Sequence, residues 1–330
     1  MTQSVGISLP VDDGFGPSHH AELAREAETC GFDTVAVGEV AGSEALVTMA
    51  HLAGATSRIV LSTGIVSIYS RPPALAAMAF ASLTDLAPGR IVAALGTSTP
   101  VMVEQWWGRE FASPVSTMRD YITILRSVLA GDRVRHDGPS LSSNGFRMGL
   151  PPAEVAIVVG AVGPLLLELA AQEADGAMLT MVRPGEIADF RTAIGAAIPA
   201  ERASDFSLSV SGIRAYAGDS AVDYRARSRT LLASYLHVST HRRRLIAAAP
   251  ELSNALGADA STWSDALPDQ LVHELAPSGS TSIAEVVESH WNNGVDEVLL
   301  HLTGARPRDL DGCLQTIRAV ASTLGLRQAR

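Results

Sequence analysis

The chain has 330 residues, of which 47% are hydrophobic, and its formal net charge is -10 at pH 7. An acidic chain lacks the basic face that neutralises phosphates, so we expect no nucleic-acid partner and predict a small-molecule ligand instead. The length and the apolar content allow a large core, in one barrel or in two smaller domains.

The two cysteines, Cys30 and Cys313, have neither a disulfide nor a metal-type spacing. All 25 residues counted as Lys or Arg are arginines, which excludes Schiff-base chemistry on a lysine. The chain begins without a charged stretch followed by an apolar one, and its longest apolar run, Val155–Leu167, is too short to span a bilayer. We therefore predict a cytoplasmic protein that does not contact membranes.

The predicted elements alternate between strands and helices along the chain. Three modules repeat an amphipathic helix, a Gly/Asp step and an apolar strand, at residues 21–39, 165–181 and 283–302. Five more apolar strands are predicted at residues 5–9, 59–66, 91–95, 155–159 and 208–216. Consecutive apolar positions indicate strands that are covered on both faces, as in a parallel sheet.

The stretch Arg58–Gly96 is the most informative part of this pattern. It reads as a strand, a long irregular loop, a helix opened by Pro72-Pro73, and a second strand after Pro88-Gly89. Such a βαβ unit requires a right-handed crossover between parallel strands, and α/β proteins bind their ligands at the carboxyl ends of those strands. The unit therefore indicates a site as well as a fold.

About eight strands with helices between them favour a closed (β/α)8 TIM barrel over an open sheet. We predict one domain over residues 1–330, with insertions after barrel strands 4 and 7 at about residues 97–152 and 219–280. The first insertion contains a predicted helix over Ser116–Leu129 and a segment typical of a short hairpin. The second is helical in composition and longer than one crossover needs.

A small-residue turn joins the predicted strand at 155–159 to the following helix. Gly160, Ala161, Val162 and Gly163 precede Pro164, which suits the first position of a helix. Free backbone N–H groups at such a helix start favour a phosphate-type anion. A tight turn that simply requires small residues explains the pattern equally well.

Polar residues follow three other predicted strands. Gly96, Thr97 and Ser98 could hydrogen-bond a heteroaromatic ring or a phosphate, or could form an ordinary polar turn. Glu39 ends the strand TVAVGE and is a candidate acid, base or ligand contact, or else a loop-supporting residue. Arg183 is in the equivalent place after AMLTM and could meet an anionic group or lie at the surface.

No metal site is predicted, because no histidine stands in metal-ligand spacing with a second histidine or a carboxylate. We expect the histidines to be solvated or to pack in the core.

Several motifs together cover nearly the whole chain, from Val5 to about Leu302. They are, in order, GFDTVAVGE, TGIVSIYSRPPALAAMAFASLTDLAPGR, WWGREF, VVGAVGP, ADGAML and GVDEVLLHL. With these motifs in this order, the chain resembles members of the bacterial luciferase-like superfamily of flavin- and deazaflavin-dependent oxidoreductases. The branch it resembles most contains the methylenetetrahydromethanopterin reductase that uses coenzyme F420 and its actinobacterial relatives.

The resemblance implies a TIM barrel that holds the tricyclic ring at the carboxyl ends of its strands. It implies a bulge with a non-prolyl cis peptide at Gly64-Ile65 beneath the ring. It also assigns the turns at Gly96–Ser98 and Val162–Pro164 to ring and phosphate contacts, and Arg183 to an anionic group. Homodimerisation is implied in the same way.

The chain departs from the family where the proton donor is expected. Glu39-Val40 replaces a common Asp-His pair, and Thr99 replaces a Glu found in some members. The proton could therefore come from Glu39, from an insertion, or from water or the substrate.

Three functions remain open on this basis. The first is an F420-dependent oxidoreductase that transfers a hydride between the deazaflavin ring and a small organic substrate. The second is an FMN-dependent monooxygenase supplied by a separate flavin reductase. The third is a barrel that keeps the fold but has lost turnover and acts as a cofactor-binding or interaction protein.

Overall fold

The computed structural model describes residues 3–11, 13–255 and 260–326 of the chain. Within these ranges one sheet has the strand order β3-β2-β1-β11-β10-β9-β8-β5-β4, and a further pairing of β3 with β5 closes it into a barrel. Every pair of neighbouring strands in this sheet is parallel. The predicted TIM barrel is confirmed.

The strands occupy the predicted positions to within a few residues. Their bounds are β1 Ser4–Ser8, β2 Thr34–Val37, β3 Val60–Thr63, β4 Val66–Ser67, β5 Ile91–Gly96, β8 Ala156–Gly160, β9 Gly176–Thr180, β10 Ser207–Ala215 and β11 Glu297–Leu302. β3 and β4 are two parts of the third barrel strand, which is interrupted at Gly64-Ile65. The described residues thus form eight barrel strands, as predicted.

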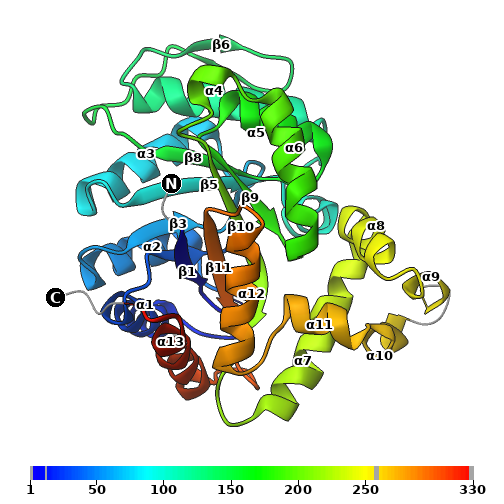
Figure 1. Ribbon diagram of the computed structural model, residues 1–330. Coiled ribbons are helices and arrows are strands. Elements are labelled where there is room, and N and C mark those ends of the chain that lie inside the picture. The colour runs from blue at the N-terminus through cyan, green and yellow to red at the C-terminus, as the bar shows by residue number, and fades with distance from the viewer. Residues whose placement is uncertain (1–2, 12, 256–259, 327–330) are drawn as a thin grey trace.

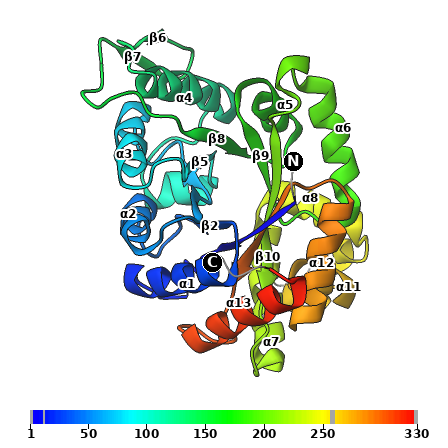
Figure 2. The same ribbon diagram turned by 60° about the vertical axis from the view of Figure 1, so that its left-hand side comes forward.

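A ring of helices surrounds the barrel, as Figure 2 shows. These helices are α1 Pro17–Cys30, α2 Ala45–Ala55, α3 Pro73–Leu86, α4 Pro114–Leu129, α5 Pro164–Glu173, α6 Ile187–Ala197, α12 Ser280–Asn292 and α13 Leu310–Leu324. Local sequence sets several of their ends: Glu44 caps α2 by accepting from the Val47 N–H, and Gly31 closes α1 at a φ of 88°.

Two groups of elements extend this alternation. Between β5 and α5 lie the π-helical turn η1 Val101–Trp106 and the antiparallel pair of β6 Arg135–Asp137 and β7 Ser142–Asn144, which is the predicted hairpin. Between β10 and α12 lie α7 Ala221–Ser234, α8 Ser239–Ala248, α9 Leu252–Ala255, α10 Trp263–Ala266 and α11 Asp269–Leu275. In Figure 1 this second group, coloured yellow-green to orange, gathers at one side of the barrel.

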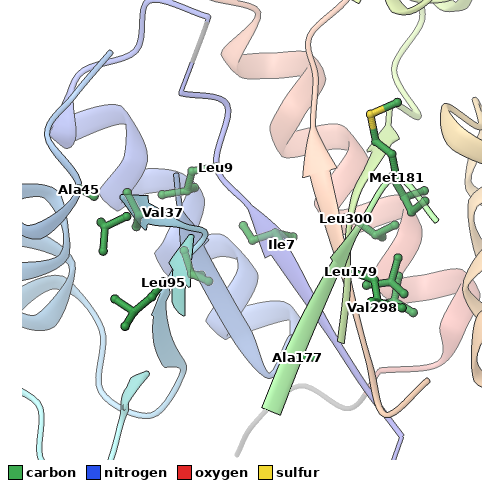
Figure 3. Close-up of a cluster of buried hydrophobic side chains, with 14 of the residues drawn as sticks. Ile7, Leu9, Val37, Ala45, Leu95, Ala177, Leu179, Met181, Val298 and Leu300 are labelled. Carbon is green, nitrogen blue, oxygen red and sulfur yellow. The ribbon is translucent and has the colours of Figure 1, made fainter. Parts of the chain in front are cut away.

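The core has two parts because strand side chains alternate between faces. One face of each strand packs beneath the helices. Figure 3 shows Ile7 on β1, Leu9 directly after β1, and Val298 and Leu300 on β11 as examples. The opposite face fills the barrel interior with a small cluster of Ala36, Ala94, Val158, Met178 and Leu299. The next inward position on each strand, two residues further along, therefore lies at the mouth of the barrel.

The described ranges contain no helix long and apolar enough to cross a membrane. They also contain no group of three or more His, Cys, Asp or Glu side chains that could hold a metal ion.

Candidate functional site

A cavity of about 370 Å³ opens at the carboxyl ends of the barrel strands. Every barrel strand contributes its uppermost inward residue to the cavity wall: Ser8, Gly38, Gly64, Gly96, Gly160, Thr180, Ser211 and His301. Half of this ring is glycine and half is polar. The cavity therefore has one side without side chains and one side with hydrogen-bonding groups.

The glycine side is shaped around Ile65. A Cβ atom on Gly96 would lie 2.5 Å from Ile65 Cδ1, and a Cβ atom on Gly160 would lie 3.1 Å from Ile65 Cγ2. Ile65 itself packs on the cluster in the barrel interior. The small residues thus let one apolar side chain cover the interior and form the floor of the cavity.

The Gly64-Ile65 peptide bond is cis, as the family resemblance implies. It lies between β3 and β4, at the point where the third strand is interrupted. Gly64 and Ile65 both line the cavity.

The turn at 160–163 forms one end of the cavity. Gly160, Ala161, Val162 and Gly163 line it, and Pro164 is the first residue of α5. No side chain of the described residues caps this helix, and a Cβ atom added to Gly163 would have nothing within 4 Å. The free N–H groups and the helix dipole make this end a good environment for an anion.

The turn after β5 supplies Gly96, Thr97, Ser98 and Thr99 to the same cavity. Ser98 has a φ of 62°, and its hydroxyl faces Met102 Sδ at 3.1 Å. Thr97 and Ser98 therefore border the cavity beside the glycine side, where the sequence placed a ring contact.

Glu39 lines the cavity but is engaged by an arginine. Arg71 donates from Nη1 to Glu39 Oε2 at 2.9 Å and from Nη2 to Oε1 at 2.6 Å, and it also pairs with Glu44. The side chains of Arg71 and Glu39 are only 14% and 13% exposed. Both carboxylate oxygens of Glu39 thus accept from one guanidinium, which fixes the position of this side chain in the cavity wall.

Arg183 lies apart from this cavity wall. Its guanidinium donates to Glu186 at 3.3 Å and to Glu274 at 3.4 Å, and it is not among the residues that line the cavity. The structure therefore brings together the predicted site residues from Glu39 to Gly163 but leaves Arg183 in an ion-pair cluster beside α6 and α11.

The structure adds site residues that the sequence pattern did not single out. Tyr235, Val238, Thr240 and His241, from the end of α7 to the start of α8, reach the cavity from the second insertion. Burial lowers the pKa of His241 to about 4, and Arg244 contributes in the same direction. No sequence signal marks these residues, since only the packing of the insertion brings them to the barrel mouth.

His301 also lines the cavity, at the end of β11. Burial is the main cause that lowers its pKa to about 3, with Arg214 and Arg227 contributing. Its period-2 spacing with Glu297 and Leu299 could have indicated an inward-facing histidine rather than a solvated or core one.

A closed (β/α)8 barrel with a ligand-sized cavity at the carboxyl ends of its strands is the architecture of a small-molecule-binding barrel or enzyme. Comparison with known proteins gives the family. Residues 2–292 match the family model described as luciferase-like monooxygenase. The chain belongs to this family.

Two curated relatives match parts of the chain. A Mycobacterium tuberculosis protein named as a coenzyme F420-dependent oxidoreductase is 36% identical over 186 residues, which are 52% of this chain and 54% of the relative. The 5,10-methylenetetrahydromethanopterin reductase of Methanolobus tindarius is 30% identical over 187 residues, 56% of this chain and 55% of the relative. The chain thus spans about half the length of the curated relatives it matches.

One solved structure shows the same fold over nearly the whole chain. The coenzyme F420-dependent tetrahydromethanopterin reductase from Methanopyrus kandleri superposes with a TM-score of 0.77, covering 98% of this chain and 100% of that one. The identity is 18%, so this likeness concerns the fold alone.

Proposed function

We propose that this protein is a coenzyme F420-dependent oxidoreductase that transfers a hydride between the deazaflavin ring and a small organic substrate. The observation that carries the proposal is the cavity, in which a glycine-lined apolar floor adjoins a free helix start. The names of the two curated relatives favour F420 as the cofactor.

The residues present fit such a cofactor. A flat ring can lie against Ile65 because no side chain rises from Gly38, Gly64, Gly96 or Gly160. The open N-terminus of α5 suits the phosphate that follows the ring's side chain. When bound, the deazaflavin supplies the carbon that accepts or donates the hydride.

The chain's own residues orient the reactants and limit the entry of water. The interior cluster beneath Ile65 closes the barrel below the cavity, so ligands enter only from the mouth. The residues from Tyr235 to His241 border that mouth and would contact a substrate that lies over the ring. Arg71 holds the Glu39 side chain in a fixed position at the wall through two hydrogen bonds.

Direct binding of cofactors tests the proposal. Purified protein is titrated with F420 and separately with FMN, and ring fluorescence is recorded. We expect saturable F420 binding that Gly163→Val weakens, with weak or no FMN binding. Tight FMN binding without F420 binding would overturn the proposal.

A flavin-dependent monooxygenase is the second candidate, and the description of the matched family favours it. Both cofactors place a phosphate at the Gly163 turn, so only the titration separates them. In that case the protein needs reduced FMN from a partner reductase. Binding of neither cofactor would favour the third function, a barrel without turnover.

Sedimentation of the purified chain tests the expected homodimer in the same preparation.

A further inference from the structure

Three polar residues stand side by side on the side of the cavity opposite the Gly163 turn. In the parallel register Ser8 of β1 is paired with His301 of β11, and His301 is paired with Arg214 of β10. Residues paired in register point to the same face of a sheet. Since Ser8 and His301 line the cavity, the register places Arg214 on the same inner face of the sheet next to His301, although Arg214 is not itself among the residues that line the cavity.

These three side chains have few partners among the described residues. The Arg214 side chain makes one hydrogen bond, from Nη1 to Thr303 Oγ1 at 3.1 Å, although Arg214 is only 6% exposed. The Ser8 hydroxyl and the His301 ring make no hydrogen bond to any residue in the described ranges. Because Ser8 and His301 line the cavity and have no side-chain partner in the described ranges, their hydrogen-bonding groups are free to bind a ligand there.

The charge of the row is positive. His301 has a pKa of about 3 and is neutral at physiological pH, whereas the Arg214 guanidinium is charged. The buried carboxylate of Asp13 is engaged by Arg227 and by the Gly304 N–H. No described carboxylate pairs with Arg214, so its charge has no counter-ion within the described part of the protein.

We propose that Ser8, His301 and Arg214 form a substrate subsite that binds a carboxylate. The inference rests on the proposed function, because it places the substrate beside the ring-binding side and across the barrel from the phosphate end. Arg214 supplies the charge, while the neutral His301 ring and the Ser8 hydroxyl donate hydrogen bonds that fix the orientation. The substrates of this protein are therefore small organic acids.

Matched probes that differ in charge test the subsite. Benzoate and benzamide have nearly the same shape, and each is titrated against the full chain by calorimetry. We expect benzoate to bind at least about tenfold more tightly than benzamide, because the carboxylate supplies the negative charge that Arg214 has no partner for in the described residues. Proton–nitrogen NMR of the histidine rings, with His301 assigned through His301→Asn, should shift only with benzoate.

Variants then separate the row from nonspecific charge effects. Arg214→Met should weaken benzoate about 30-fold or more, as expected for truncating one side of a buried charge pair. Arg119→Met is the control, because it removes a positive charge that pairs with Glu173. Glu173 ends α5, whereas the start of α5 lies at the cavity, so this variant should leave benzoate binding unchanged. Arg214→Lys should retain part of the affinity, since it keeps the charge but loses the planar fork.

If Arg214→Met does not fold, Ser8→Ala provides the test of the subsite. This variant deletes only one hydroxyl and should still weaken benzoate binding severalfold. Equal binding of benzoate and benzamide overturns the subsite, as does an equal loss in Arg119→Met. A wild-type chain that binds F420 but shows no preference for benzoate refutes the subsite alone. One that prefers benzoate but binds no F420 refutes the proposed function and leaves the carboxylate site in place.

Discussion

The fit between Gly96 and Ile65 gives the sharpest test of how the cavity is built. A methyl group added in Gly96→Ala would lie 2.5 Å from Ile65 Cδ1 and 2.6 Å from Ile65 Cγ1. Both distances are well inside van der Waals contact, so Ile65 must move or the strands must separate. Overpacking of this kind costs about 1–3 kcal/mol.

The expected change in melting temperature follows from the size of the chain. With about 2.1 cal/mol/K of unfolding entropy per residue, a protein of this length has about 0.7 kcal/mol/K, so a loss of about 2 kcal/mol lowers the Tm by about 3 °C. Calorimetry or circular dichroism measures this shift. Gly195→Ala is the matched control: Gly195 lies in α6 with open space where the added methyl group would be, and alanine there should stabilise the helix by about 0.5–1 kcal/mol.

A second substitution tests the cause of the loss. Ile65→Ala removes both atoms that clash and leaves Ile65 Cβ, which is 3.4 Å from the position of the added methyl group. Gly96→Ala should therefore cost almost nothing in the Ile65→Ala background, which gives a coupling free energy of about 1–2 kcal/mol. If Gly96→Ala melts like wild type, or if its cost persists beside Ile65→Ala, the assignment of Ile65 as the cavity floor is wrong.

Three further predictions concern the anion turn, the buried histidine of α1 and the Arg71 pairs. Gly163→Val should weaken F420 binding about tenfold or more with an unchanged Tm, since nothing lies within 4 Å of the added Cβ, and an unchanged affinity would contradict a phosphate at this turn. Burial lowers the pKa of His20 to about 4 from 6.5, so the unfolded chain binds a proton at a higher pH than the folded chain does. The contribution of neutral His20 to stability is therefore fully present above pH 6.5 and is lost as the pH falls toward 4. The free energy of unfolding, measured by urea titration at several pH values, should depend on pH more steeply in wild type than in His20→Met, by about 1.4 kcal/mol per pH unit in this window. An equal pH dependence in the two proteins would refute the assignment. Glu39→Gln should lower the free energy of unfolding by about 1–2 kcal/mol, more than Glu44→Gln, because Glu44 is 42% exposed and Glu39 only 13%. A glutamine at position 44 can still accept from the Val47 N–H, so the cap of α2 is kept in this comparison. Urea melts that rank the two variants the other way would show that Arg71 relies on Glu44.

Local sequence was sufficient to predict the order and type of the barrel elements. Apolar runs of four to nine residues, the prolines at positions 73 and 164 and the glycine at position 31 each act within one or two turns of the chain. The eight strands therefore agree with the pattern, and α4 begins at Pro114, two residues before its predicted start at Ser116. The small-residue turns after β5 and β8 were visible for the same reason, because glycine and hydroxyl residues at a strand end are a local signal.

Pairings over long sequence distances could not be predicted in this way. Glu39 carries the same local signal whether it is free or paired, and only the fold brings Arg71, 32 residues away, onto its carboxylate. Tyr235 and His241 belong to an insertion whose composition predicts helices but not where they pack.

The sequence by itself determined a parallel (β/α)8 barrel with turns suited to a phosphate and a ring, because these features depend on periodicity and on residues adjacent in the chain. Only the tertiary structure decided what the barrel mouth contains. Closure of the sheet aligns the ends of all its strands, and this places Gly96 and Gly160 against Ile65 and sets Ser8, His301 and Arg214 next to one another. Strand register and ring closure, which no local pattern encodes, thus fix the chemistry of the cavity.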